Sequence, residues 1–324
     1  MKLKNALKKK LFSTATGQVF FYKVRKLREL WAYRRSDIDA LQRIYQKRFG
    51  HRIDFINPVA FTEKLQWLKL FYRDEKMTLC SDKYRIREYL ESLGLEYLAN
   101  DLIGVYKDAY DIDWNALPNK FVAKANHGSG WNLICTDKTK LDRKDNCGLM
   151  NEWLKLDLSA FGREWNYKEI EPRIVVEKYI EHEPLNDYKF MCFNGEPLYM
   201  QLNNDFEGKH YVDFYELDGW KHLPYTYGPY HLSDRVIEKP PMYDEMLELA
   251  KQLSKPFPFV RVDFYNYDDV VILGELTFFP GGGLWPLNPV ETGYDKILGE
   301  RLQLPSPNHN LELLAKLKEK AEMK

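Results

Sequence analysis

The sequence predicts an α+β fold in which antiparallel strands dominate. Strand-like runs, rich in β-branched and aromatic residues, begin near Lys120 and recur through the rest of the chain. Asn194-Gly195 separates two of these runs and is a strong signal for a tight hairpin turn. The regular alternation of strand and helix that a doubly wound parallel sheet requires is missing. We expect strands at 121–126, 132–136, 174–180, 188–193 and 198–203, with a last hairpin over 259–283.

Helices are expected at both ends of the chain and between the strand groups. In the N-terminal 80 residues, apolar side chains recur at helical spacing in two stretches, 41–49 and 65–72, and Asn57-Pro58 separates them. A further helix is expected from Ser81-Asp82 to Gly94, another around 243–253, and an amphipathic one at 311–320.

The net charge of the chain is zero, but it is unevenly distributed. Met1 to Arg35 contains eleven Lys or Arg residues and one acid, so this segment carries +10. Its first residues, with Leu3, Leu7 and Leu11 on one helical face, suit an anionic membrane surface, and a solvated basic terminus is an equally open interpretation. No apolar run approaches the roughly 20 residues that span a bilayer. We expect a cytoplasmic protein, with peripheral contact at the inner face of the plasma membrane through residues 1–35.

The last hairpin places charged residues inside apolar runs, where an unpaired charge is costly to bury. Arg261 and Asp263 share one face of the first strand, and Glu275 and Thr277 share one face of the second. If the turn leaves an odd number of residues unpaired, the two carboxylates lie on the same side. They would then suit Mg²⁺, which takes one or two carboxylates together with substrate phosphates. A salt-bridge network on an exposed sheet face is the alternative.

Three more segments carry features of a phosphate or nucleotide site. A strand bearing Lys124 leads into the loop Gly128-Ser129-Gly130, whose glycines allow backbone N–H groups to approach phosphate, although a plain hairpin turn would look similar. His127 in this loop suits hydrogen bonding better than catalysis. Lys83 stands at an expected helix start, where an anionic ligand or solvent would offset its conflict with the helix dipole. The strand expected within 173–184 ends in charged residues, which fits either a ligand-binding site or a strand that leaves the core.

Together and in this order, these segments resemble the ATP-grasp superfamily, and most closely its TupA-like branch, which is associated with teichuronopeptide and other cell-surface polysaccharide loci. The resemblance covers about residues 57–288. It rests on the motifs NPxxFTEKLQWLK, SDKYxxREYL, FVAKANHGSG, VVEKYI, DYKFMCFNG, RVDFY and ELTFFPGGG. It implies two α+β subdomains that grip ATP, at 81–182 and 183–300, with a helical N-terminal region at 1–80 and a C-terminal helix at 301–324.

The resemblance also implies roles for single residues. The nucleotide would be held by Lys83 and Lys124 at the phosphates, Gly128, Ser129 and Gly130 as a closing loop, Glu177, Lys178 and Ile180 as the adenine hinge, Glu183 at the ribose, and Lys189 as another phosphate contact. Asp263, Glu275 and Thr277 would hold Mg²⁺, with two ions expected, although the superfamily commonly has Asn where this chain has Thr277. Arg261 would steady the transferring phosphoryl group, with Lys124 and Lys189 as further catalytic cations.

The implied activity is an ATP-dependent carboxylate–amine ligase that acts through an acylphosphate. Its substrates would be a carboxylate-bearing glycan or sugar precursor of the capsule, teichuronic or O-antigen type, and an amine or amino acid; no nucleic-acid partner is expected. The alternatives are a glycosyltransferase or sugar kinase of polysaccharide biosynthesis, and an ATP-binding module without catalysis. A glycosyltransferase motif is matched only superficially, by Asp111-Ile112-Asp113.

Overall fold

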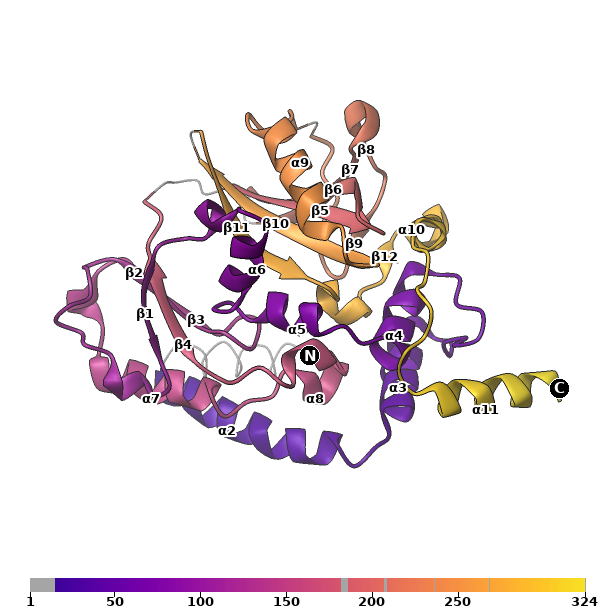
Figure 1. The fold of residues 1–324 in the computed structure, drawn as a ribbon, viewed down its shortest axis with the longest axis horizontal. Coiled ribbons are helices and arrows are strands. Elements are labelled where there is room, and N and C mark those ends of the chain that lie inside the picture. The colour runs from indigo at the N-terminus through magenta and orange to yellow at the C-terminus, as the bar shows by residue number, and fades with distance from the viewer. Residues whose placement is uncertain (1–14, 182–185, 207–208, 236, 268, 324) are drawn as a thin grey trace. The chain divides into compact units, whose positions relative to one another are not determined.

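The computed structural model describes residues 15–181, 186–206, 209–235, 237–267 and 269–323 (Figure 1). The chain forms two compact units. Unit 1 consists of Met1–Ser36 and Thr78–Glu181, and unit 2 of Asp37–Met77 and His182–Lys324. Residues 1–80, which we grouped as one helical region, are therefore divided between the units. Each unit combines helices with antiparallel strands, as expected for an α+β fold.

Unit 1 contains a four-stranded antiparallel sheet with the order β1-β4-β2-β3. Its strands are β1 (Leu102–Tyr106), β2 (Phe121–Ala125), β3 (Asn132–Cys135) and β4 (Ile174–Lys178). The sequence did not indicate β1, because this edge strand is short, has no fully buried residue and is interrupted by Gly104. The other three strands lie where the sequence placed them.

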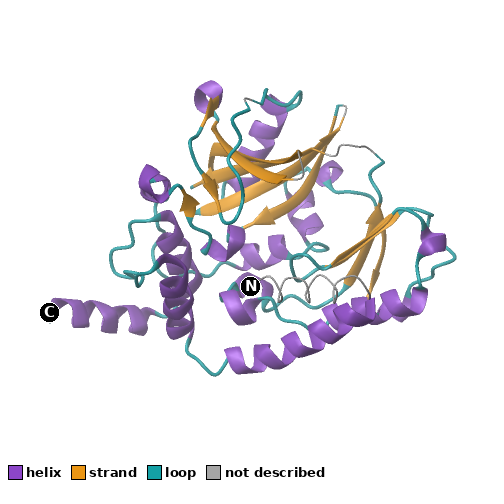
Figure 2. Ribbon diagram, turned by 180° about the vertical axis from the view of Figure 1, so that it is seen from behind, coloured by secondary structure: helices purple, strands orange, loops and turns teal. Residues whose placement is uncertain are grey.

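The core of unit 1 lies between this sheet and two helices, α2 (Ala15–Ala32) and α7 (Arg143–Trp153), which run along each other (Figure 2). Tyr22 of α2 and Trp153 of α7 are buried in one cluster with Ala123 and Val176 of the sheet. The unit also contains α6 (Ile86–Ser92) and α8 (Ser159–Gly162), and α5 (Glu75–Ser81) leads into it. None of the helices in the described ranges is long and apolar enough to cross a membrane.

Unit 2 contains a six-stranded antiparallel sheet with the order β11-β10-β5-β6-β7-β8. Its strands are β5 (Asn186–Phe193), β6 (Glu196–Phe206), β7 (Lys209–Glu216), β8 (Lys221–His222), β10 (Phe259–Tyr267) and β11 (Val270–Thr277). Asn194 and Gly195 join β5 to β6 with φ angles of 52° and 85°, which are the left-handed values that a type I′ hairpin needs. The hairpin prediction is confirmed.

The remaining elements of unit 2 surround this sheet. Helix α9 (Tyr243–Ser254) packs on one face, against β5, β6 and β10. A small sheet pairs β9 (Thr226–Tyr227) with β12 (Leu287–Asn288), and the other helices are α3 (Asp37–Phe49), α4 (Phe61–Phe71), α10 (Tyr294–Arg301) and α11 (Leu311–Glu322). Helix α4 packs against α10 and against the glycine turn, Pro280–Gly283.

A β-bulge fixes the register of the last hairpin. At its tip Tyr267 pairs with Val270, which leaves two residues in the turn rather than the odd number that the site required. The register then shifts by one residue at Gly274, so that Asp263 lies opposite Glu275 and Arg261 lies opposite Thr277. The expected juxtaposition of the two carboxylates is present, but the bulge produces it and the turn does not.

Candidate functional site

In unit 1, Lys83 lies beside the glycine loop 128–130. Its Nζ donates a hydrogen bond to the carbonyl oxygen of Gly128 at 2.6 Å, and its backbone N–H donates to Asn126 at 3.2 Å. Two segments that the sequence offered separately as phosphate-binding candidates are thus in direct contact. The loop itself requires glycine, because a Cβ at Gly128 would lie 2.2 Å from the ring of Trp131 and Gly130 has a φ of +74°.

The helix expected from Ser81-Asp82 to Gly94 is present as α6, but it begins only at Ile86, so the prediction of its start was wrong. Helix α5 ends at Ser81 and α6 begins at Ile86, with Lys83 in the turn between them. Asp82 is buried, and its carboxylate accepts hydrogen bonds from the backbone N–H of Tyr84 at 2.9 Å and from Asn126 Nδ2 at 2.9 Å. The side chain of Asp82 favours the turn by satisfying these donors, and the turn directs Lys83 to the loop.

Lys124 of β2 and Glu177 of β4 form an ion pair on neighbouring strands. The distance from Lys124 Nζ to Glu177 Oε2 is 2.7 Å, and Arg87 of α6 reaches the other oxygen of the same carboxylate at 3.2 Å. Glu177 is buried, whereas the two cations are partly exposed. The carboxylate therefore holds two positive side chains at the sheet, where a phosphate or other anion could reach them from solvent.

The expected adenine hinge begins where β4 ends. The N–H of Lys178 donates to the Asp101 carbonyl at 2.9 Å, and the carbonyl of Lys178 accepts from Asn100 Nδ2 at 2.9 Å. These bonds connect the hinge to the segment before β1. Ile180 follows the strand and is half-buried, and Glu183 lies outside the described residues.

His127 is a buried hydrogen-bonding residue, as expected. Its Nε2 lies 3.2 Å from the carbonyl oxygen of Leu156, and burial lowers the pKa of the imidazole to about 4. The ring is therefore neutral near pH 7, which suits a structural role at the base of the loop.

In unit 2, three strands place a row of charged and polar side chains on one face of the sheet. Lys189 of β5 lies opposite Asp263 of β10 in register, and Asp263 lies opposite Glu275 of β11. Arg261 and Thr277 are two residues further along and share that face. The prediction that these residues lie together is supported by the register of all three strands.

Asp263 is the centre of this cluster. Arg261 binds both of its carboxylate oxygens, with Nε at 2.7 Å and Nη2 at 2.6 Å, and Lys189 Nζ donates to Asp263 Oδ2 at 2.9 Å. Arg261, Asp263 and Lys189 are all buried. The salt-bridge alternative from the sequence is thus partly realised: the ion pairs are present, but the sheet face that carries them is buried.

Glu275 is the most accessible acid of the cluster, with a side chain 38% exposed. It accepts a hydrogen bond from Thr277 Oγ1 at 3.0 Å and lies 3.5 Å from Arg261 Nη2. Thr277 thereby orients Glu275, which is a role that the sequence did not assign to it.

The charges in this cluster shift one another's pKa values. Burial lowers the pKa of Lys189, but Asp263 and Asp187 outweigh this effect and the net change is upward. Burial raises the pKa of Asp187, which Lys189 partly offsets. Burial likewise opposes the charged form of Arg261, yet Asp263 raises its pKa overall. Both cations therefore stay charged across the physiological range and can meet an anionic substrate.

The donors available for a metal are all oxygens. No group of three or more His, Cys, Asp or Glu residues with metal-binding geometry occurs in the described part of the chain. Asp263, Glu275 and Thr277 still fit Mg²⁺ by chemistry, because this ion takes few protein carboxylates and completes its shell with phosphates and water. Glu275 is the accessible ligand, whereas Asp263 would have to share its oxygens with Arg261 and Lys189.

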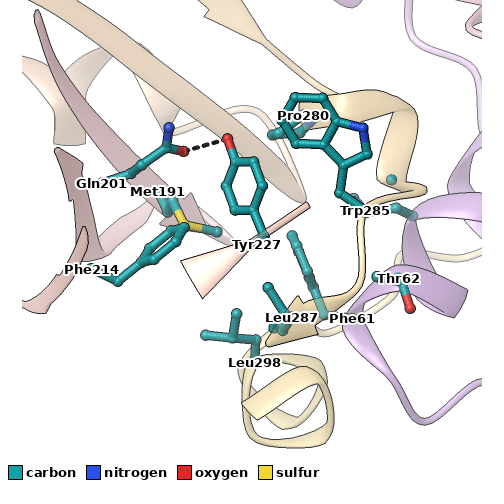
Figure 3. A pocket seen from close by; sticks show the side chains of 12 residues that line it. Phe61, Thr62, Met191, Gln201, Phe214, Tyr227, Pro280, Trp285, Leu287 and Leu298 are labelled. Atoms are coloured by element: carbon teal, nitrogen blue, oxygen red, sulfur yellow. Dashed lines mark hydrogen bonds between the residues drawn. The ribbon is translucent and has the colours of Figure 1, made fainter. Parts of the chain in front are cut away.

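A pocket lies on the same sheet face as these charges (Figure 3). The space inside it and at its mouth is about 400 Å³, which includes the part open to solvent. Its walls are mainly apolar and aromatic: Phe61, Thr62, Leu65, Met191, Gln201, Phe214, Tyr227, Pro280, Gly283, Trp285, Leu287 and Leu298. Tyr227 points at Gln201 and its hydroxyl donates to Gln201 Oε1 at 2.9 Å, which places a polar pair on an apolar wall.

Helix α4 fixes the glycine turn at the edge of this pocket. Gln66 Nε2 donates to the Gly283 carbonyl at 2.8 Å, and the buried Lys69 donates to the Gly282 carbonyl at 2.5 Å. Gly281, Gly282 and Gly283 all have positive φ angles, so the turn has a left-handed backbone that favours glycine.

The sequence reasoning missed three residues of this site. Gln66 and Lys69 are three residues apart in the motif FTEKLQWLK. If this motif is helical, the two side chains lie on the same face of the helix. Asp187 shares the face of Lys189, and its Oδ2 accepts a hydrogen bond from that residue. Period-two alternation in DYKF would have indicated Asp187.

The chain was compared with solved structures, with curated protein sequences and with family models. The chain resembles the D-alanine–D-alanine ligase of Bacillus anthracis complexed with ATP, with 16% identity, a TM-score of 0.40 and coverage of 75% of this chain and 68% of the other. It resembles the same ligase of Helicobacter pylori, with 15% identity, a TM-score of 0.40 and coverage of 75% and 69%. It also resembles the N5-carboxyaminoimidazole ribonucleotide synthetase of Thermus thermophilus, with 9% identity, a TM-score of 0.37 and coverage of 69% and 53%.

No curated protein sequence matches the chain significantly. A family model described as TupA-like ATPgrasp matches residues 63–303, which is most of the chain and includes both units. This match supports an ATP-grasp fold and an ATP-dependent ligase. The chain therefore belongs to the TupA-like ATP-grasp family.

Proposed function

We propose that the protein joins a carboxylate to an amine at the expense of ATP, through an acylphosphate, and that the carboxylate belongs to a cell-surface polysaccharide or its precursor. The observation that carries the proposal is the cluster on the sheet of unit 2. It combines two buried cations, Lys189 and Arg261, with an accessible carboxylate, Glu275, on the sheet face that also carries an apolar and aromatic pocket.

The first step forms the acylphosphate. An oxygen of the substrate carboxylate attacks the γ-phosphorus of ATP, and the bond to the bridging oxygen breaks, so that ADP leaves with the electron pair. Lys189 and Arg261 are already charged and held by Asp263, so they neutralise the growing negative charge with little reorganisation. Mg²⁺ bound at Asp263 and Glu275 would supply further neutralisation of the phosphate oxygens.

In the second step the amine nitrogen attacks the acyl carbon. The bond from that carbon to the phosphate oxygen breaks, phosphate leaves and the nitrogen loses a proton, which gives the amide. The apolar walls of the pocket would limit access of water to the acylphosphate, which would otherwise hydrolyse.

Each unit, taken by itself, carries candidate contacts for the nucleotide. In unit 1 we assign the phosphates to Lys83, Lys124 and the loop 128–130, because Lys83 contacts that loop directly. We assign adenine to the backbone beyond Lys178, since the N–H and carbonyl of Lys178 already have partners. In unit 2 Lys189 and Arg261 are the phosphate contacts.

The substrate is proposed from the pocket and the family together. The TupA-like family suggested a glycan carboxylate, and aromatic side chains such as Tyr227 and Trp285 suit the apolar face of a sugar ring, while Gln201 offers a polar contact. A uronic acid fits this description, with its carboxylate directed to Arg261 and its ring in the pocket.

The test is ATP turnover by the full chain with a panel of uronic acids, free and glycan-linked, each with and without amines. We expect ADP and free phosphate to appear together only when carboxylate and amine are both present. Hydroxylamine in place of the amine should trap the acylphosphate as a hydroxamate. Phosphate retained on the sugar would identify a kinase instead, and consumption of a nucleotide sugar without ATP would identify a glycosyltransferase.

A further inference from the structure

Helix α2 carries an exposed apolar stripe on the side that faces away from the core of unit 1. Phe20, Val24, Leu27 and Trp31 are spaced by four, three and four residues, which places them within about 60° of the helix circumference. Their exposed fractions are 59%, 41%, 63% and 63%. Tyr22, on the opposite side of the helix, is buried in the core. The stripe is thus an additional apolar surface and not part of the packing of the unit.

Basic residues border the stripe on both sides. At 100° per residue, Lys23 lies along one edge of the stripe and Arg28 along the other. Arg34 and Arg35 follow just after the helix ends at Ala32, and all four basic side chains are exposed. The guanidinium of Arg34 lies 3.9 Å from the centroid of the Trp31 ring.

The acidic residue of α2 is turned away from this face. Glu29 is the one acid in the sequence of the helix, it is buried, and it pairs with Arg25 and Lys26 at 3.4 Å each. The face formed by the stripe with Lys23 and Arg28 therefore bears positive charge without a neighbouring carboxylate from its own helix. We call it the α2 face.

We propose that the α2 face binds an anionic lipid surface, with the helix lying parallel to the membrane. An apolar strip flanked by Lys and Arg is the pattern of interfacial helices, whose apolar side chains enter the headgroup boundary while the cations meet lipid phosphates. Trp31 at the end of the strip suits that boundary, where one side of the ring is apolar and the other is hydrated. A second copy presenting the same face would instead set like charges against each other.

This proposal concerns a different surface from the active site and does not depend on the proposed reaction. It narrows the expectation of membrane contact through residues 1–35 to one face of helix α2, and residues 1–14 lie outside the described residues. The α2 face belongs to a helix that is packed into unit 1, so the contact would hold the unit itself at the membrane.

The test is flotation of the full chain with vesicles of phosphatidylcholine alone and with vesicles that also contain phosphatidylglycerol. We expect binding to the anionic vesicles, with weakening at high salt because exposed charges are screened. Leu27→Glu should lower the partition coefficient at least tenfold. The matched control is Leu311→Glu, which changes a leucine of similar exposure, 55%, on helix α11 and should leave binding unchanged.

A second pair of variants separates charge from apolar contact. Each basic residue near an anionic surface contributes a factor of about five, so Lys23→Gln with Arg28→Gln should reduce binding about 25-fold. Lys318→Gln with Lys320→Gln removes the same charge from exposed positions of α11 and should have little effect. All positions are exposed, and circular dichroism checks that the fold is retained.

Three results would overturn the proposal. The first is the same binding by Leu27→Glu and Leu311→Glu. The second is binding to neutral and anionic vesicles alike, or to neither. The third is concentration-dependent self-association of the native chain that Leu27→Glu abolishes without changing vesicle binding, which would make the α2 face an interface between copies.

Discussion

The replacement Asp263→Asn tests whether the charge cluster of unit 2 is structural, functional or both. Asp263 neutralises Arg261 and Lys189, and all three side chains are buried. Removing one partner of a buried ion pair typically costs about 3–5 kcal/mol, because the remaining charge is left without compensation. We expect the lower end, about 3 kcal/mol, since asparagine keeps one acceptor oxygen for Arg261 and Lys189 keeps its contact with Asp187.

The assay is unfolding of the full chain by urea and by heat, each monitored by circular dichroism and by tryptophan fluorescence. A loss of about 3 kcal/mol corresponds to a fall in melting temperature of roughly 6–12 °C for a unit of this size. A loss of turnover by Asp263→Asn would therefore not by itself assign this residue to the reaction.

Glu275→Gln is the control that separates the two roles. Its side chain is partly exposed and lies 3.5 Å from Arg261, at the limit of a hydrogen bond, so we expect less than about 1 kcal/mol of destabilisation. If the carboxylates bind metal, Glu275→Gln should nevertheless abolish Mn²⁺ binding measured by electron paramagnetic resonance. Unchanged stability of Asp263→Asn, within about 0.5 kcal/mol, would refute the charge argument. Unchanged Mn²⁺ binding by Glu275→Gln would refute the metal assignment.

Three further outcomes follow from single contacts. Burial lowers the pKa of His127 to about 4 in the folded chain, against about 6.5 in the unfolded chain, so its contribution to the free energy of unfolding should be full above pH 6.5 and fall by about 2 kcal/mol at pH 5. Denaturation of His127→Gln should lack this loss. An equal loss in that variant would contradict the assignment of His127 as a buried neutral imidazole. Gly283→Ala should lower the free energy of unfolding by about 2–4 kcal/mol, because the added Cβ would lie 2.6 Å from Gln66 Nε2. The control Gly293→Ala has a similar φ but open space around it, so it should lose only about 1 kcal/mol. Equal urea midpoints of the two variants would rule out the contact with Gln66. Lys124→Met should weaken ATP binding at least tenfold by calorimetry and lower the free energy of unfolding by about 1–3 kcal/mol. The control Lys120→Met breaks an exposed ion pair, so it should lower the free energy of unfolding by less than about 0.5 kcal/mol and leave ATP affinity unchanged. Equal ATP affinities of the two variants would remove Lys124 from the site.

The sequence determined the local features, because they depend on neighbouring residues. Asn194-Gly195 set a hairpin, since both positions accept left-handed backbone, and alternation placed Arg261 on the same face as Asp263. The glycines of the loop at 128–130 and the family motifs were visible for the same reason.

Tertiary structure decided how distant segments meet. The bulge at Gly274 set Asp263 opposite Glu275, although the turn alone would have separated them, because one residue of register reverses the face of every side chain. The turn that brings Lys83 to Gly128 depends on the buried carboxylate of Asp82, whose partner Asn126 lies 44 positions away. The exposure of Leu27 likewise followed from which side of α2 packs on the core. Sequence periodicity shows that a helix has an apolar side, but only packing decides which apolar residues are left on the surface.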